Sequence, residues 1–160
     1  MIFDLVKDTK INENYKLMAQ IIIPRPIAWV VTQNNGVINI ASFSYFIGLS
    51  SEPATVLISI EATPKDTLSN IRKNKKYVIH MVDEPNLQKM HFSSKSIDKD
   101  LSEAELFDIA TKIIFDDFLP MIKDVPCAYF CILNQEINLN GKTIPLVLIQ
   151  LLELEKVMQN

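Results

Sequence analysis

Three short polar clusters in the first half of this 160-residue chain could bind an anion. Arg25 stands between Pro24 and Pro26, which restrict the backbone on both sides of the guanidinium group. The segment 39–44 reads Asn-Ile-Ala-Ser-Phe-Ser, and the segment 63–71 reads Thr-Pro-Lys-Asp-Thr-Leu-Ser-Asn-Ile. The three clusters could converge on one anionic ligand, although Arg25 could equally be a surface residue before a strand.

The third cluster has the composition of a helix start. Thr63 can be the N-cap, Pro64 the first helical residue, and Asp66 the return acceptor of a capping box. The pattern predicts a helix that runs to about Asn74.

The start of that helix could hold a phosphate group. Its first backbone N–H groups have no partner within the helix and carry a partial positive charge. Lys65, Thr67 and Asn70 can add side-chain donors. A capped surface helix with a solvated lysine explains the same residues.

The segment 39–44 predicts a strand with room beside it. In a strand, Ala41 and Phe43 share one face, while Ile40, Ser42 and Ser44 share the other. Small residues such as Ala41 and Ser42 would let a flat ring approach the backbone. An edge strand with a polar outer face is the alternative.

The remaining pattern predicts a mainly β domain. The segments 26–33 and 37–46 flank Asn34-Asn35-Gly36, which is typical of a hairpin turn. Further strands are predicted over 54–60, 76–82, 127–137 and 143–154, and short amphipathic helices over 84–92 and 101–111. Six or seven strands joined mostly by hairpins favour an antiparallel barrel with peripheral helices over a doubly wound sheet.

Length and charge narrow the class of protein. A chain of 160 residues suits a single domain over 1–160. The net charge of −3 argues against nucleic-acid binding. The apolar run 17–31 is interrupted by polar residues and prolines, and residues 1–10 lack the pattern of a secretory signal. We therefore expect a cytoplasmic protein without a membrane span.

No set of residues predicts a catalytic side chain or a metal site. Cys127 and Cys131 lack companion ligands and are expected to be buried thiols. His80 alternates within an apolar strand and is expected in the core, whereas His91 is expected at the surface. The acidic residues of 98–108 are interpreted as a solvated helix face. Three glycines in the whole chain exclude both the dinucleotide fingerprint and the Walker loop.

The order and spacing of the clusters resemble the flavin reductase-like family of FMN-binding split barrels. The matching segments are Pro24-Arg25-Pro26, Thr32 followed by a turn at Gly36, the run 39–46, Ser50-Ser51-Glu52-Pro53, and the run 65–71. The resemblance continues more weakly through Tyr77-Val78-Ile79 and residues 126–131, so it covers most of the chain.

This resemblance implies a Greek-key split barrel that forms homodimers and holds FMN, with FAD less favoured, near the subunit interface. The strand 39–44 would line the isoalloxazine and ribityl chain, and the start of the following helix would meet the phosphate. The implied flavin contacts are Arg25, Thr32, Asn39, Ile40, Ala41, Ser42, Ser44, Lys65, Asp66, Thr67 and Asn70.

The family also implies an oxidoreductase that passes electrons from NAD(P)H through flavin to free flavin or another small acceptor. The flavin would carry the redox chemistry, so no side chain need act as acid or base. Asn140-Gly141-Lys142-Thr143 stands where family members commonly carry a Gly-Asp-His type turn. A flavin-binding electron carrier or sensor without its own nicotinamide site is therefore the alternative, and an interaction module that has lost flavin is a third reading.

Overall fold

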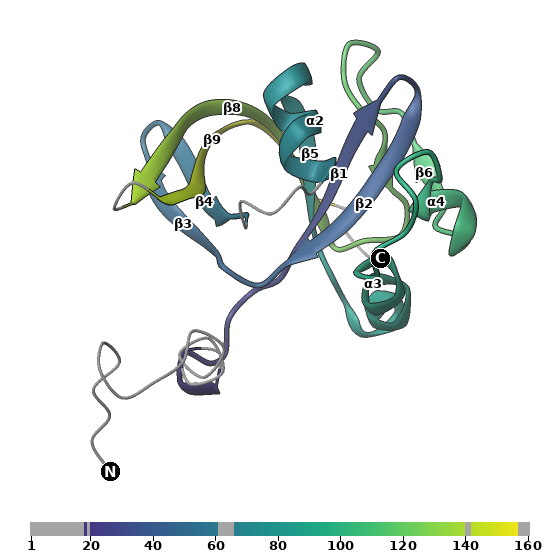
Figure 1. Ribbon diagram of the computed structural model, residues 1–160, viewed down its shortest axis with the longest axis horizontal. Coiled ribbons are helices and arrows are strands. Elements are labelled where there is room, and N and C mark those ends of the chain that lie inside the picture. The colour runs from purple at the N-terminus through teal and green to yellow at the C-terminus, as the bar shows by residue number, and fades with distance from the viewer. Residues whose placement is uncertain (1–17, 19, 61–65, 140–141, 157–160) are drawn as a thin grey trace.

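The computed structural model describes residues 18, 20–60, 66–139 and 142–156, with the backbone alone for 138, 139 and 142–156 (Figure 1). Residues 61–65 lie outside the described part of the chain, so the predicted N-cap at Thr63 and the position of Lys65 do too.

The hairpin predicted around residues 34–36 is present. Strand β1 (Ala28–Asn34) pairs antiparallel with β2 (Val37–Phe43), from Ala28 opposite Phe43 to Asn34 opposite Val37. Asn35 and Gly36 have φ values of 49° and 88°, the left-handed conformation that two-residue hairpin turns require. The same residues that predicted the turn therefore form it.

In the described part of the chain, seven antiparallel strands form one curled sheet. The other five are β3 (Phe46–Ser51), β4 (Ala54–Ser59), β5 (Lys76–Met81), β8 (Cys127–Leu139) and β9 (Lys142–Lys156). Their order is β2-β1-β5-β8-β9-β4-β3, so β2 and β3 lie at the two edges although they follow one another along the chain (Figure 1). This architecture confirms the predicted mainly β class with peripheral helices.

The predicted strand over 37–46 is divided into two at Ser44 and Tyr45. There the chain bends away from β1, and the carbonyl of Tyr45 accepts a hydrogen bond from the Ser59 N–H at 2.9 Å. The bend lets one run of sequence supply both edges of the curled sheet (Figure 1).

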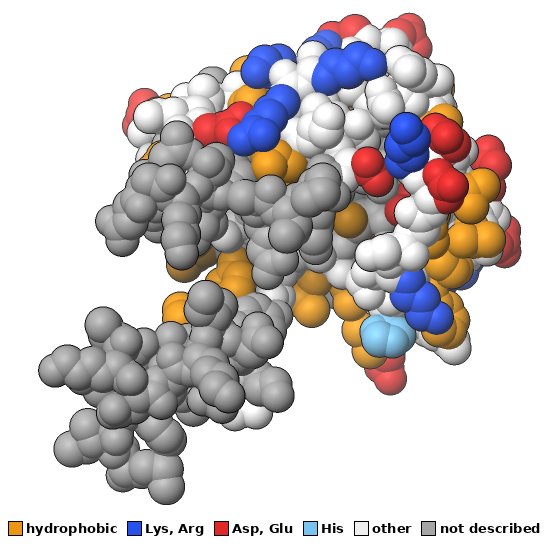
Figure 2. Space-filling view, in the orientation of Figure 1, with side chains coloured by type: hydrophobic (Ala, Val, Ile, Leu, Met, Phe, Trp, Pro, Cys, Tyr) orange, Lys and Arg blue, Asp and Glu red, His pale blue; other side chains and the backbone are white. Residues whose placement is uncertain are grey.

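Helix α2 (Asp66–Asn74) packs across β1 and β2, with Thr67, Leu68, Asn70 and Ile71 buried. Its last turn carries Arg72 and Lys73, and Figure 2 shows Lys and Arg side chains gathered over this helix. Arg72 forms an ion pair with Glu136 of β8 at 2.8 Å. Helix α2 ends at Asn74, which confirms the predicted end of the helix.

The remaining short elements include two helices that contact β2 and a small strand pair that contacts β5 (Figure 1). They are the 3-10 helix η1 (Glu84–Asn86), helices α3 (Leu87–Ser93) and α4 (Glu103–Leu106), and the small pair β6 (Thr111–Lys112) and β7 (Met121–Ile122). No helix in the described part of the chain is long and apolar enough to cross a membrane.

The helix predicted over 101–111 is wrong in its second half. Asp108 has a φ of 50°, and the Ile109 N–H bonds back to the Ala104 carbonyl at 2.8 Å. A left-handed residue followed by this hydrogen bond is the Schellman arrangement that ends helices. It stops α4 after one turn, where the apolar pattern alone suggested continuation.

The two cysteines differ in burial. Cys131 is buried in β8 and Cys127 is half-buried, because the register with β9 shifts between Phe130 and Cys131 and breaks the simple alternation of faces. Burial raises the pKa of the Cys131 thiol. The expectation of two buried thiols holds for Cys131 alone.

His80 lies fully buried in the core, as predicted. Its Nδ1 is 2.9 Å from the carbonyl oxygen of Trp29, and its Nε2 is 3.0 Å from the backbone nitrogen of Ile122. A carbonyl can only accept and an N–H can only donate, so Nδ1 carries the proton and the ring is neutral. Burial lowers the pKa of His80 to about 4, against the opposing effect of the Trp29 hydrogen bond.

We expect His80 to make the protein acid-sensitive. The pKa is lower in the folded state, so the stabilisation is complete above the unfolded value of 6.5 and is lost as pH falls through about 4. From pH 7 to pH 4 this group should remove about 3 kcal/mol from the free energy of unfolding. The comparison variant is His80→Gln, which keeps an acceptor for the Ile122 N–H. Urea unfolding of both proteins at several pH values measures how the free energy of unfolding changes with pH in each. Parallel pH profiles would contradict the assignment.

Candidate functional site

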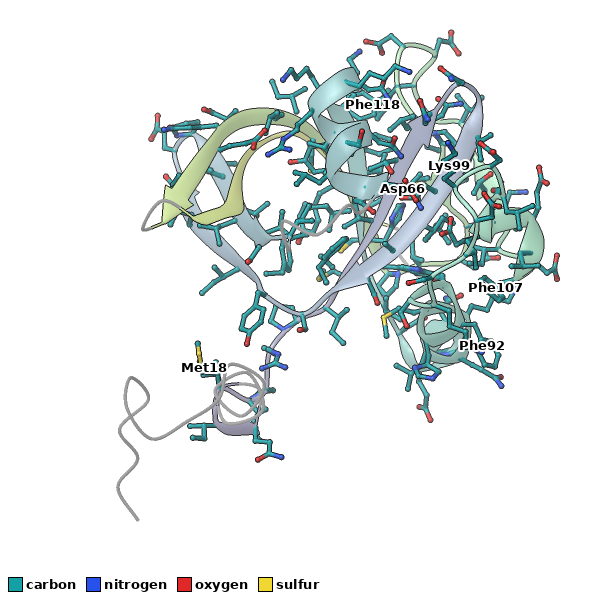
Figure 3. The ribbon with its side chains drawn as sticks, in the orientation of Figure 1. Met18, Asp66, Phe92, Lys99, Phe107 and Phe118 are labelled. Atoms are coloured by element: carbon teal, nitrogen blue, oxygen red, sulfur yellow. The ribbon has the colours of Figure 1, made fainter. Side chains whose placement is uncertain are left out.

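A polar pocket of about 170 Å³ lies between β2, the start of α2 and the segment after α3. Figure 3 labels Asp66 at the start of α2, beside the β1–β2 hairpin. The lining residues are Asn39, Ala41, Asp66, Thr67, Ser93, Ser94, Lys95, Ser96, Ile97 and Glu103.

Asn39 joins the hairpin to α2 through a chain of hydrogen bonds. Its Oδ1 lies 3.0 Å from the hydroxyl oxygen of Thr32 and 3.0 Å from that of Thr67. The Thr32 hydroxyl oxygen in turn accepts from Asn70 Nδ2 at 3.1 Å. Thr32, Thr67 and Asn70 are buried. Hydrogen bonds shielded from water therefore fix the position of α2 against β1 and β2.

Glu103 closes this network from the side of α4. Its side chain is only 4% exposed, and its two carboxylate oxygens accept from Asn39 Nδ2 at 3.1 and 3.2 Å. Oε2 also accepts from the Ile40 backbone N–H at 2.9 Å. Ser102 adds a hydrogen bond to the carbonyl of Ile38 at 2.8 Å, so α4 is fixed to β2.

Burial raises the pKa of the Glu103 carboxyl. The hydrogen bonds from Ile40 and Asn39 oppose that shift, whereas the negative charge of Asp66 adds to it. Lys95 is the cationic side chain among the described lining residues, with its Nζ 4.8 Å from the centre of the Phe92 ring. The pocket therefore combines hydroxyl and amide groups with one amine and two carboxyl groups.

Six of the residues predicted for the site meet here. Thr32, Asn39, Thr67 and Asn70 form the network, and Ala41 and Asp66 line the pocket beside it. Ile40 contributes its backbone N–H to Glu103 while its side chain is buried in the core.

The other predicted residues lie elsewhere or outside the described residues, as Lys65 does. Ser42 and Ser44 are half-buried and are absent from the pocket lining. The guanidinium carbon of Arg25 lies 5.5 Å from the centre of the Tyr45 ring. Arg25 borders a second cavity of about 290 Å³, lined by Arg25, Pro26, Ile27, Met81, Val82, Leu87 and Met90.

The sequence did not indicate Glu103 or the serines after α3. The interpretation of 98–108 as a solvated face is wrong for Glu103. Phe107, which follows the single turn of α4, packs against the core, and an acid one turn before such a residue suggests a buried partner. Ser93 accepts from Trp29 Nε1 at 2.9 Å and donates to the Met90 carbonyl at 3.0 Å.

The rings of Phe92 and Phe107, both labelled in Figure 3, lie 6.2 Å apart and connect α3 to the end of α4. Together with the Trp29–Ser93 hydrogen bond, this contact sets the position of the segment that carries Ser94 and Lys95. The pocket wall opposite α2 is therefore positioned by core packing.

The chain belongs to the flavin reductase-like domain family, whose sequence model matches residues 18–156. An uncharacterized protein of Aquifex aeolicus is 32% identical over 132 residues, which cover 79% of this chain and 67% of that protein. An uncharacterized protein of Halalkalibacterium halodurans is 33% identical over 139 residues, which cover 82% of this chain and 65% of that protein. The matched part of this chain thus spans about two thirds of the length of these relatives.

Solved structures show the same fold. The 2-nitrobenzoate 2-nitroreductase NbaA of Pseudomonas fluorescens superposes with a TM-score of 0.88 at 27% identity, covering 98% of this chain and 76% of that one. Nitrilotriacetate monooxygenase component B of Bacillus cereus superposes with a TM-score of 0.90 at 25% identity, and the match covers 98% of this chain and 81% of that one. A split-barrel domain protein of Shewanella frigidimarina superposes with a TM-score of 0.87 at 21% identity, and the match covers 100% of this chain and 81% of that one. The curled sheet is thus the split barrel predicted from the sequence.

We expect Asn39→Ala to destabilise the protein by about 2 kcal/mol, since it strips two donor contacts from a buried carboxylate and the shared acceptor from two buried hydroxyls. Urea unfolding at pH 7 measures the loss. Ser42→Ala is the matched control, because it removes a polar group from the same strand but outside the network. Equal losses in both variants would show that the network adds no stability.

Proposed function

We propose that this protein binds FMN in the pocket between β2 and α2 and acts as a flavin-dependent oxidoreductase. In this proposal it passes electrons from NAD(P)H through the flavin to free flavin or another small acceptor. The supporting observation is that Asn39 and Ala41 of β2 meet the start of α2 at one polar pocket. Family membership supports a flavin as the ligand.

The two walls suit different parts of a flavin. Ala41 has only a methyl side chain, so β2 leaves space for a flat ring to approach. Asp66 and Thr67 at the start of α2 line the pocket, and the first turn of a helix presents backbone N–H groups and the positive end of the helix dipole, which favours a phosphate. Lys95 adds a positive charge on the facing wall.

FMN is proposed over FAD from the family resemblance. Lys65, Arg25, Ser42 and Ser44 remain proposed contacts from the family resemblance alone.

When bound, the flavin would supply the hydride and electron transfer, while the protein binds and orients it. His80, with both ring nitrogens hydrogen-bonded in the core, has no free nitrogen for proton transfer. We therefore propose no catalytic acid or base among the described residues. A reaction that draws on NAD(P)H fits the cytoplasmic location expected from the sequence.

The names of two related structures favour small acceptors. One is a 2-nitrobenzoate 2-nitroreductase, and the other is a component of nitrilotriacetate monooxygenase. We propose by analogy that this chain reduces either a small organic acceptor or a flavin that another protein uses.

The function is tested by FMN binding and by NADH and NADPH oxidation with added FMN. We expect a flavin absorbance spectrum on the purified protein and turnover that depends on FMN. Ala41→Leu should weaken FMN binding by about tenfold or more, because the larger side chain fills the pocket. Ala110→Leu, at an exposed position outside the pocket, is the control.

Three outcomes separate the alternatives. Binding without nicotinamide oxidation would favour an electron carrier or sensor. No binding of FMN or FAD would reject a flavin function and favour an interaction module. Equal binding by the Ala41 and Ala110 variants would place the flavin elsewhere on the protein.

We also propose that two copies associate through the edge strand β3. Ile47 and Leu49 are 60% and 55% exposed on this strand, an apolar surface that a lone soluble chain rarely presents at a sheet edge. Three further exposed isoleucines stand at 21–23, before β1. A second copy of the chain is the proposed partner, in line with the homodimer that the resemblance implies.

Light scattering after size-exclusion chromatography should give about twice the chain mass of 18.2 kDa. We expect the double variant Ile47→Lys, Leu49→Lys to run as a monomer, because the interface would have to bury two charges. Ile113→Lys changes a side chain that is 67% exposed outside β3 and should leave the dimer intact. A dimeric double variant would reject β3 as the interface.

A further inference from the structure

The direction of each hydrogen bond around Asn39 follows from the groups involved. A carboxylate only accepts, so the atom of Asn39 that faces Glu103 must be the donor Nδ2. The opposite orientation would place the amide oxygen against two carboxylate oxygens. Glu103 in its ionised form therefore fixes the orientation of the Asn39 amide.

The amide orientation decides where two hydroxyl protons point. Asn39 Oδ1 can only accept, so Thr32 and Thr67 each donate their single proton to it. Thr32 then uses a lone pair to accept from Asn70. Thr67, which lines the pocket, has only lone pairs left for a ligand.

We propose that Glu103 is a positioning residue that makes the Thr67 hydroxyl an acceptor in the pocket. It does so through Asn39, without contacting the ligand at that point. The favoured neighbour of Thr67 is then a ligand group that donates a hydrogen bond, such as a hydroxyl of a sugar-alcohol chain, and a phosphate oxygen is disfavoured. This inference rests on the proposed function for the identity of the ligand as a flavin.

A neutral residue at position 103 should reverse the network. In Glu103→Gln the amide oxygen is needed by the Ile40 N–H, so the NH₂ group faces Asn39. Asn39 then turns its oxygen toward position 103 and its Nδ2 toward the threonines. Thr67 accepts from Asn39, and its proton becomes available to the pocket.

Protonation of Glu103 should have a similar effect in the unmodified protein. Burial raises the pKa of this carboxyl, so the change should occur above the ordinary range of glutamate. The charged groups facing it are Asp66 from α2 and Lys95 from the segment after α3. Strand β2 contributes no titratable side chain.

The first test needs no ligand. In ¹⁵N-labelled protein, the side-chain NH₂ signals of Asn39 and the backbone signal of Ile40 should shift together with one pH midpoint above that of an ordinary glutamate. The midpoint should persist in Thr67→Val and disappear in Glu103→Gln, with circular dichroism to confirm folding. Signals in the unmodified protein that do not follow such a titration would overturn the proposal.

The second test compares FMN with riboflavin, which differ only in the phosphate. In Glu103→Gln the freed Thr67 proton can be donated to a phosphate oxygen, which is disfavoured beside Thr67 in the unmodified protein. The ratio of riboflavin to FMN dissociation constants should therefore rise about fivefold, roughly the contribution of one hydrogen bond. Loss of a negative charge alone could also raise it, so the same change is made in a Thr67→Val background. There we expect a rise of about twofold or less, because the hydroxyl is gone.

An equal rise in both backgrounds would show that Glu103 acts by charge alone, and would overturn the proposal. A tenfold fall in the ratio for Thr67→Val alone would also overturn it, because it would mean that Thr67 donates directly to the phosphate. If neither flavin binds, the proposed function fails, while the titration of Asn39 and Ile40 still decides the role of Glu103.

Discussion

The buried contact between Glu103 and Asn39 holds three parts of this protein together. A carboxylate removed from water is costly unless donors surround it, and here Asn39 and the Ile40 N–H provide them. Helix α4 has a single turn and could not be stable alone, so its place depends on these bonds to β2. Because Asn39 also accepts from α2 and β1, the pocket geometry depends on the same contact.

The other wall of the pocket depends on Trp29. Its indole N–H donates to Ser93 at the end of α3, and its carbonyl accepts from His80 of β5. One buried residue of β1 thus connects the sheet interior to the segment that carries Lys95. The β1–β2 hairpin therefore supports both the α2 wall of the pocket, through Asn39, and the opposite wall after α3, through Trp29.

Local patterns in the sequence predicted the elements but only part of the site. The Asn35-Gly36 turn and the end of α2 follow from backbone preferences that neighbouring residues alone determine. Glu103 could not be placed in this way, because its donors lie more than sixty positions earlier in the chain and become neighbours only when α4 packs on β2. Arg25 could not be placed in this way either, since its neighbour Tyr45 lies at the bend after β2 and its cavity is completed by residues of β5 and α3.

The charges of the pocket limit how it can select a ligand. The described lining has two carboxyl groups and one amine, so a general positive field does not draw an anion into it. Recognition of a phosphate would have to come from directional donors at the start of α2, which act only at short range. Selection then depends on which way each hydroxyl and amide points. Glu103 is 4% exposed, so salt screens it less than a surface charge, and in our proposal it sets these directions at Asn39 and Thr67.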